Sequence, residues 1–323
     1  MLTDRFVKSK WGVMCHLLDR IQNNPEIEFS SEGKKTSWNE LIAQFDVENF
    51  AAQLYEMQAK YLLITIMQGS KYMIAPNKTY DEIICAKPGE ACSERDLVLD
   101  LYDVLKKYDI DLYLYYTGDG PYQDEIAGPK MGFHKRFEER PVPGKFIENW
   151  SSVLKEYAWR YRGKVKGWWI DGCYDEAFGY TEEKLRVYHT ILKEADENYL
   201  VTYNDGFACN QAFKHEPNLR LGKYMPFEDY TAGEALDFNI YPPSRFIDGA
   251  QWHILSPLSG DDTQWNCGWG GTGIKYSEEE FAEYLKKVWA QGGVVSVDMA
   301  LSRSGNFHET QKTFMKNVMK KVK

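Results

Sequence analysis

The 323-residue sequence lacks the features that mark several large classes of protein. It has no run of about 18 apolar residues, so no transmembrane helix is predicted. Basic residues number 39 against 48 acidic ones, which gives a formal net charge of -9. Nucleic-acid-binding proteins normally present a basic face, so this balance argues against that class. We therefore expect neither a membrane nor a nucleic acid as a partner.

Cysteine is sparse, and its spacing excludes a zinc framework. The six cysteines are scattered and none forms a C-x-x-C pair, the spacing that structural zinc sites use. We predict free thiols, with a bridge between Cys85 and Cys92 left open as an alternative.

The first 18 residues lack the long apolar core and the small-residue cleavage site of a signal peptide. As given, the sequence predicts a cytoplasmic protein. If an export signal was trimmed before residue 1, a periplasmic or secreted protein is expected instead.

What the sequence has in abundance is aromatic side chains. They make up 15% of the chain, including 10 Trp and 22 Tyr. Most aromatic side chains serve cores. A surplus of Trp and Tyr in loops also suits sugar rings, whose C–H faces stack on aromatic rings.

Short apolar runs alternate with amphipathic stretches along the whole chain. Near-continuous apolar runs between helices are typical of a parallel sheet buried on both faces. Eight such runs predict a single (β/α)8 barrel domain of the α/β class over residues 1–323, with a doubly wound open sheet as the alternative. No Gly-rich phosphate loop follows the first strand, which disfavours the alternative. The predicted strands are 10–18, 61–67, 112–118, 165–172, 199–206, 221–229, 250–257 and 292–301.

Active sites of such barrels lie at the carboxyl ends of the strands, so the residues found there are the candidates. They are mainly carboxylates, amides and aromatic side chains: His16, Gln68, Ser70, Tyr115, Tyr116, Asp119, Asp171, Asn204, Asp205, Glu228, Asp229, Glu234, His253, Trp265, Trp269, Asp298 and Arg303. There is no G-x-S-x-G elbow, no strand-end lysine and no His-x-His pair. A metal site built from His16, Asp171 and His253 is a minor alternative, and no cofactor is predicted.

Paired carboxylates are the basis of glycoside hydrolysis, in which one acid attacks the sugar and the other donates a proton. Asp171 suits the attacking role because it ends a rigid strand in "VKGWWIDG" (165–172). An Asp-Gly pair is also a common turn or helix cap, so the residues alone leave both interpretations open.

Taken in order, these motifs resemble the α-L-fucosidases of glycoside hydrolase family 29. "FVKSKWGVMCHLL" is similar to the family's opening strand, and "FDVENFAAQLYEMQAKYLLIT" to its second strand with the preceding helix. "DIDLYLYYTGDG" resembles the third strand, and "VKGWWIDG" the W-F-D-G strand that carries the nucleophile. "VTYNDGF" and "VDMALSRSGNFHETQKTFMKNV" resemble the fifth and last strands.

The resemblance implies a retaining exo-glycosidase with a carbohydrate substrate. Asp171 would be the nucleophile, and Glu234 the acid/base, with Glu228 and Asp229 as alternatives. His16 falls on the family's substrate-binding histidine. The expected substrate-binding set is His16, Gln68, Tyr116, Asp119, Asn204, Asp229, His253, Trp265 and Trp269, with the two tryptophans as a stacking wall.

The chain departs from the family pattern at several places, and the second strand bears most directly on the sugar. The family's second strand ends K-H-H-D-G-F, whereas this chain has Gln68 and Gly69 at the paired histidines. A pocket that loses hydroxyl-binding groups should reject its former sugar, so we expect a different glycoside. The chain also resembles the catalytic barrel alone, without the C-terminal β-sandwich of many members. A carbohydrate-binding barrel without catalysis is the alternative function.

Asp175 and Glu176 follow Asp171 closely and invite two interpretations. They could assist the site, or they could be ordinary acidic residues at a helix N-terminus, where negative charge is favoured.

Overall fold

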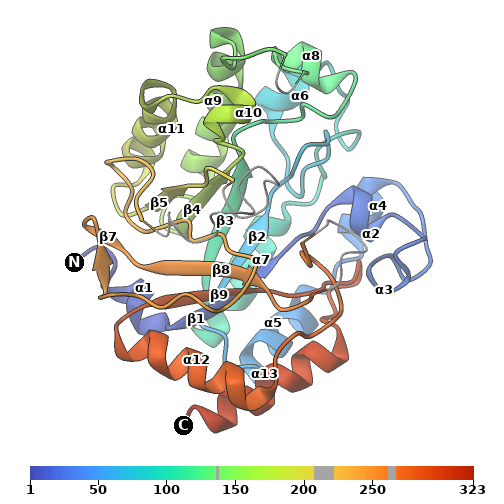
Figure 1. The fold of residues 1–323 in the computed structure, drawn as a ribbon. Coiled ribbons are helices and arrows are strands. Elements are labelled where there is room, and N and C mark those ends of the chain that lie inside the picture. Colours follow the sequence, from blue (N-terminus) through green and yellow to red (C-terminus); the bar gives the residue numbers. More distant parts are fainter. Residues whose placement is uncertain (136–137, 207–221, 261–266) are drawn as a thin grey trace.

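The computed structural model describes residues 1–135, 138–206, 222–260 and 267–323. Its centre is a seven-stranded parallel sheet with the strand order β5-β4-β3-β2-β1-β9-β8 (Figure 1). The strands are β1 (Trp11–Cys15), β2 (Tyr61–Thr65), β3 (Asp111–Thr117), β4 (Val165–Asp171), β5 (Leu200–Tyr203), β8 (His253–Pro257) and β9 (Val294–Asp298). A separate two-stranded ribbon pairs β6 (Phe246–Ile247) with β7 (Ala250–Gln251).

Helices precede β1 and connect the strands from β1 to β5 and from β8 to β9 in chain order, and they cover the outer face of the sheet (Figure 1). The longer ones are amphipathic, and side-chain caps fix where several begin, as Ser277 does for α12 with a capping box. The helices are α1 (Asp4–Ser9), α2 (Asp19–Gln22), α3 (Glu28–Ser31), α4 (Trp38–Ala43), α5 (Val47–Glu56), α6 (Lys78–Ile84), α7 (Leu97–Leu105), the 3-10 helix η1 (Lys106–Tyr108), α8 (Ala127–Met131), α9 (Gly144–Arg160), α10 (Asp175–Phe178), α11 (Glu182–Ala195), α12 (Glu278–Ala290) and α13 (Glu309–Lys321). No helix within the described residues is long and apolar enough to cross a bilayer.

An irregular segment, residues 229–235, spans the gap between the two edge strands β5 and β8. The amide of Asp229 donates to the carbonyl of Val201 on β5 at 3.0 Å. On the other side, Tyr230 and Glu234 form isolated parallel bridges with Gln251 and Leu255. This segment therefore lies between the two edge strands, in the place of the sixth strand of the (β/α)8-type barrel.

The sixth strand in chain order was predicted at residues 221–229, and that prediction is wrong. Residues 222–228 form turns and bends, and the ladder contacts begin only at Asp229. Glu228 and Asp229 consequently stand where this segment enters the barrel wall, and Glu234 stands toward its carboxyl end.

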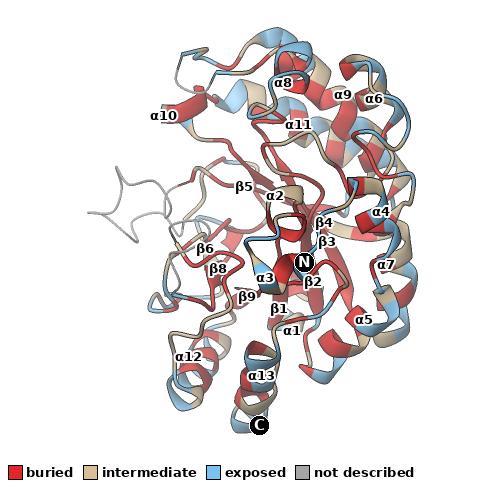
Figure 2. Cartoon of the chain, turned by 90° about the vertical axis from the view of Figure 1, so that its right-hand side faces the viewer, coloured by how far each residue is buried: buried red, intermediate tan, exposed pale blue. Residues whose placement is uncertain are grey.

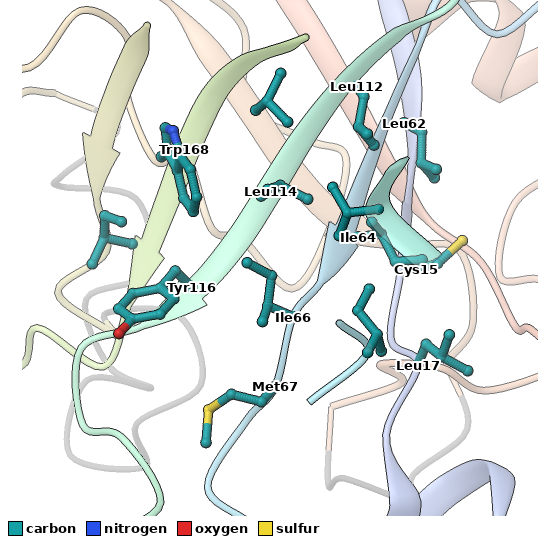
Figure 3. Close-up of a cluster of buried hydrophobic side chains, with 14 of the residues drawn as sticks. Cys15, Leu17, Leu62, Ile64, Ile66, Met67, Leu112, Leu114, Tyr116 and Trp168 are labelled. Carbon is teal, nitrogen blue, oxygen red and sulfur yellow. The ribbon is translucent and has the colours of Figure 1, made fainter. Parts of the chain in front are cut away.

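Figure 2 shows that the strands of the sheet are largely buried. Two apolar cores lie on the two faces of this sheet. The larger one packs the strands against the helices and includes Ile64, Leu114, Tyr116 and Trp168 (Figure 3). The smaller one fills the barrel interior with aromatic rings. At its floor, Phe6 of α1 lies 5.1–5.6 Å from the rings of Tyr61, Tyr113, Tyr230 and His253.

Cys85 and Cys92 are not bridged, and they are free thiols together with Cys15, Cys173 and Cys267. Cys209 lies outside the described residues.

Candidate active site

A pocket of about 130 Å³ opens at the carboxyl end of the parallel strands. Aromatic and apolar side chains form most of its wall, and carboxylates, an amide and an imidazole provide its polar groups. The lining residues are Met14, His16, Gln68, Tyr115, Trp169, Asp171, Tyr174, Glu234, Leu255 and Trp269.

Asp171 ends β4 and lies at the centre of the polar groups, with 6% of its surface exposed. Tyr115 and Asn204 donate hydrogen bonds to its two carboxylate oxygens, the second at 2.7 Å. Tyr174 donates to Oδ1 at 3.1 Å, and the amide nitrogen of Gln68 lies 3.5 Å from Oδ2. Hydrogen-bond donors therefore surround this carboxylate on several sides.

The hydroxyl of Tyr115 keeps its proton and can serve as a donor to this carboxylate. Burial, reinforced by the negative charge of Asp171, raises the pKa of Tyr115 well above its usual range. The ring of Tyr115 also stacks on Trp169 with a centroid distance of 5.4 Å, so the donor is held on a rigid aromatic wall.

Asn204 joins the two candidate catalytic carboxylates. Its side-chain nitrogen donates to Oδ1 of Asp171 and to Oε2 of Glu234. The residue follows β5, and its backbone amide continues the ladder by donating to the carbonyl of Ile170 at 2.7 Å. Glu234 comes from the segment 229–235 and is half-buried. The strands β4 and β5 and the segment 229–235 therefore place Asp171 and Glu234 within hydrogen-bond distance of the side-chain amide of Asn204.

His16 lies on the other side of the pocket and belongs to a second polar cluster. Its Nδ1 is 2.8 Å from Oδ1 of Asp298, which ends β9. The amide of Gly270 donates to the other oxygen of Asp298 at 2.6 Å. The imidazole lies 6.3 Å from the ring of Tyr115 and 6.0 Å from that of Trp269. Asp298 thus fixes the ring of His16 just beyond the carboxyl end of β1.

Tyr116 corrects one prediction, because it faces away from the pocket. Its ring stacks on Trp150 at 4.7 Å, and its hydroxyl donates to the carbonyl of that residue at 3.0 Å. Figure 3 shows Tyr116 among the side chains of the larger core. Side chains alternate along a strand, so the neighbouring Tyr115 points to the opposite face, where it lines the pocket.

His253 and Asp229 are also corrected, since both lie near the amino ends of their strands. His253 begins β8 and bonds Thr231 and Ser296 inside the barrel. Asp229 accepts from Lys193 at 2.8 Å and from the amide of Val201 at 3.0 Å. Both are structural here, and the alternative metal site of His16, Asp171 and His253 is not assembled.

Glu228 is a structural carboxylate as well. It is buried and accepts from the amides of Tyr203, Tyr224 and Met225 and from the hydroxyl of Thr202. These bonds tie the chain before residue 229 to β5. Arg303, in the loop beyond β9, donates to the carbonyl of Lys34 and to the hydroxyl of Thr36, which lie between α3 and α4.

The remaining candidates take varied places. Asp119 is buried just beyond the end of β3, accepts from Thr117 and does not line the pocket. Asp175 is an exposed residue at the start of α10. Trp265 lies outside the described residues. Among the residues that the structure describes, no group of three or more His, Cys, Asp or Glu side chains is arranged to hold a metal ion.

Sequence reasoning missed five residues of the site. Met14, Trp169, Tyr174 and Leu255 line the pocket, and Arg20 on α2 donates to the Gln68 side chain at 2.8 Å. Trp169 lies two positions before Asp171 on β4, so strand alternation would have placed both on one face once Asp171 was assigned. Arg20 lies four residues after His16 in a short helix, where no motif distinguishes it.

A parallel barrel whose strand ends hold two carboxylates around a small aromatic pocket defines the class of the protein as a glycoside hydrolase. The family model for α-L-fucosidases matches residues 8–322, and the chain belongs to that family. No curated protein sequence matches the chain.

Solved structures agree on the fold. A bacterial fucosidase with a monovalent iminocyclitol inhibitor is 17% identical with a TM-score of 0.66, covering 99% of this chain and 73% of that one. A family 29 α-L-fucosidase from Bacteroides thetaiotaomicron, trapped as a covalent intermediate, is 16% identical with a TM-score of 0.65, covering 99% and 74%. An endo-fucoidan hydrolase of family 107 is 12% identical with a TM-score of 0.66, covering 99% and 93%.

Proposed function

We propose that this protein is a retaining exo-glycosidase in which Asp171 is the nucleophile and Glu234 is the general acid/base. The observation that carries the proposal is the shared amide of Asn204, which donates to both carboxylates. Two oxygens bonded to one nitrogen lie no more than about two hydrogen-bond lengths apart, roughly 6 Å. Retaining enzymes have carboxyl groups about 5–5.5 Å apart and inverting enzymes about 6.5–9.5 Å, so this bound favours retention.

In the first step a carboxylate oxygen of Asp171 attacks the anomeric carbon as the bond to the leaving group breaks. Glu234 gives its proton to the departing oxygen. In the second step Glu234 takes a proton from water, the water oxygen attacks the same carbon, and Asp171 is released. Donors from Tyr174 and Asn204 hold the Asp171 carboxylate in place, which suits the attacking group, and Glu234 takes the role of proton donor.

The size of the pocket supports action on a terminal sugar. Its volume of about 130 Å³ is close to the roughly 150 Å³ of an engineered cavity that binds one benzene ring. Trp169, Tyr174 and Trp269 provide flat aromatic walls on which the C–H faces of a sugar ring can stack. One ring fits this space, as an exo-acting enzyme requires.

The sugar is proposed to be an α-L-fucoside or a related glycoside with different hydroxyl contacts. His16 keeps a polar position at the first strand, held by Asp298. Gln68 and Gly69 occupy the end of the second strand, where the family pattern has paired histidines. An amide and a glycine offer fewer hydroxyl contacts than two imidazoles, and buried hydroxyls without partners are costly.

The proposal is tested with a panel of 4-nitrophenyl glycosides, beginning with the α-L-fucoside. Asp171→Ala should lower kcat/KM at least about 10³-fold while the protein still folds, because the nucleophile is gone. Asp175→Ala is the matched control, since Asp175 is exposed and outside the pocket, and it should stay within about twofold of wild type.

Undiminished turnover by Asp171→Ala would sink the mechanism. If the wild-type protein turns over no member of the panel but binds a free monosaccharide in calorimetry, the carbohydrate-binding barrel without catalysis is the correct function.

A further inference from the structure

A chain of three polar side chains borders the pocket beside Asp171. Arg20 donates from Nη2 to Oε1 of Gln68 at 2.8 Å and from Nη1 to Oε1 of Gln123 at 2.9 Å. Gln68 in turn directs its amide nitrogen toward Oδ2 of Asp171, 3.5 Å away. The guanidinium of Arg20 is therefore connected to the carboxylate of Asp171 through the side-chain amide of Gln68.

Hydrogen bonds made by Gln22 fix the position of helix α2, which carries Arg20. Gln22 donates to the carbonyls of His16 and Leu301 at 2.9 and 2.8 Å, and its own Oε1 accepts from the amide of Leu18 at 2.8 Å. Gln22 is buried, with 1% of its surface exposed. The short helix that carries Arg20 is thus bonded to the end of the strand that delivers His16.

Gln123 is the second side-chain acceptor for Arg20, and the lack of a side chain at Gly69 leaves space for it. The amide of Gln123 donates to the carbonyl of Gly69 at 2.9 Å. Gly69 has φ +70°, and a Cβ there would lie 2.8 Å from the side-chain oxygen of Gln123. Any residue but glycine at position 69 would displace this side chain and strain the backbone. The backbone after β2 is therefore shaped around the partner of Arg20.

Arg20 determines which way the amide of Gln68 points. A guanidinium only donates, so the carbonyl oxygen of Gln68 must face it and the NH2 group must face the pocket. Burial lowers the pKa of Arg20, but a guanidinium stays charged at neutral pH. Without this cation the amide could turn its oxygen toward Asp171, and the donor would be lost.

The position of this donor identifies the part of the sugar that it faces. When Asp171 attacks the anomeric carbon, a donor 3.5 Å from its oxygen lies beside the substituents next to that carbon. One neighbour is the ring oxygen, which gains positive charge in the transition state and gives a donor no advantage. The other is the oxygen on the adjacent carbon, and hydrogen bonds to that oxygen strengthen in the transition state.

We propose that Arg20 is a positioning residue that fixes the Gln68 amide as a donor to the 2-oxygen of the sugar. The substrate class is accordingly glycosides that carry a hydrogen-bond acceptor at this position. The inference rests on the proposed function, since it assigns a role in the same site.

The test pairs enzyme variants with substrates. Arg20→Met and Gln68→Met are assayed on 4-nitrophenyl α-L-fucoside and on its 2-deoxy counterpart, or on the same pair for whichever sugar the panel identifies. Each variant should lower kcat/KM about tenfold or more for the hydroxylated substrate and less than about twofold for the deoxy substrate. The double variant should be no worse than Gln68→Met alone, because Arg20 acts through Gln68.

Arg162→Met is the matched control for losing one positive charge, since Arg162 is exposed and far from the pocket lining. It should change neither substrate. An equal fall on both substrates in Arg20→Met, or losses that multiply in the double variant, would overturn the proposal.

Failure of the proposed function is recognised separately, by wild-type protein that turns over no glycoside. Calorimetry with L-fucose and 2-deoxy-L-fucose then replaces the assay. A preference for L-fucose that Arg20→Met abolishes supports the role of Arg20, and no preference in the wild-type protein contradicts it.

Discussion

Asn204 shows how one neutral side chain can organise two acids. Its NH2 group has two hydrogens, and the structure directs them to Asp171 and Glu234. The backbone of Asn204 is bonded on both sides, to Ile170 and to Cys173, so the amide cannot move without disturbing β4. A donor fixed in this way stabilises charge without having to reorganise during the reaction.

Asn204→Leu should therefore reduce catalysis strongly. Removing one preorganised donor costs about 10²–10³ in kcat, and Asn204 supplies two such bonds, so kcat/KM is expected to fall by at least 10²-fold. The measurement is the initial rate on the best aryl glycoside, with the exposed Asn239→Leu as control. A loss below about threefold would show that the shared amide is not part of the chemistry.

Glu234→Gln should separate the two steps of the mechanism. An activated aryl leaving group needs little protonation, so bond cleavage should remain fast while water attack without a base becomes slow. A burst of nitrophenol followed by a slow steady state is expected in stopped-flow measurements. A uniform slowing without a burst would assign the acid/base to another residue.

At the scale of elements, the irregular segment 229–235 carries Glu234, and its geometry depends on one glycine. Gly233 has φ +65°, and a Cβ there would lie 2.0 Å from the carbonyl oxygen of His253. The contact is to backbone, which cannot move aside cheaply. Gly249 has φ +82° but open space around its Cβ position.

Gly233→Ala should consequently destabilise the fold more than Gly249→Ala. Both substitutions carry the backbone strain of a positive φ, about 1 kcal/mol, and only the first adds a clash with a strand. We expect the free energy of unfolding to fall by roughly 3 kcal/mol or more for Gly233→Ala and by about 1 kcal/mol for Gly249→Ala. Urea unfolding of both variants measures this, and equal losses would mean that the segment is not packed as described.

The elements also show what the sequence could predict. The seven regular strands and the long helices were predictable because apolar runs and 3.6-residue periodicity are strong local signals. The segment 229–235 was not, since it replaces a ladder by isolated bridges and contains a glycine with positive φ. Because this segment begins at Asp229 and does not end there, Asp229 lies at its amino end, away from the pocket.

Strand direction was predictable, but the face of each side chain was not. A parallel sheet buried on both faces shows no alternation of polar and apolar residues, so Tyr115 and Tyr116 look equivalent in sequence. His253 was expected toward the carboxyl end of its strand, because an apolar run does not show at which residue strand pairing begins. Asp171 and Asn204 were chosen because polar residues at the end of an apolar run are informative, and the structure places them at the carboxyl ends of β4 and β5. Arg20 had no such signal.

At the scale of the whole molecule, buried ionisable groups link stability to pH. Burial lowers the pKa of His253 to about 4, and its neutral ring bonds Thr231 and Ser296. The unfolded value is about 6.5, so this contribution to stability is present above pH 6.5 and is lost as pH falls toward 4. Burial raises the pKa of Glu228 to about 7, so its contribution is present below about pH 4.5 and is lost as pH rises through 7.

The contributions of His253 and Glu228 to stability change in opposite directions over the same pH range. The difference in free energy of unfolding between the wild-type protein and a His253 variant therefore isolates the contribution of His253. Between pH 7 and pH 5 the His253 contribution should fall by about 2 kcal/mol. His253→Asn keeps a donor for Thr231 but cannot take up a proton, so its free energy of unfolding should decline less over this interval by about that amount. Urea unfolding at both pH values measures it, and parallel declines would contradict the assignment.

The central claim is that Asp171 becomes covalently bonded to the sugar. The most direct measurement is mass spectrometry of the protein after incubation with a 2-deoxy-2-fluoro glycosyl fluoride of the preferred sugar, followed by peptide mapping. We predict one added glycosyl group, located on Asp171 and absent from Asp171→Ala. An active enzyme that gains no label, or that carries it on another residue, would contradict the account.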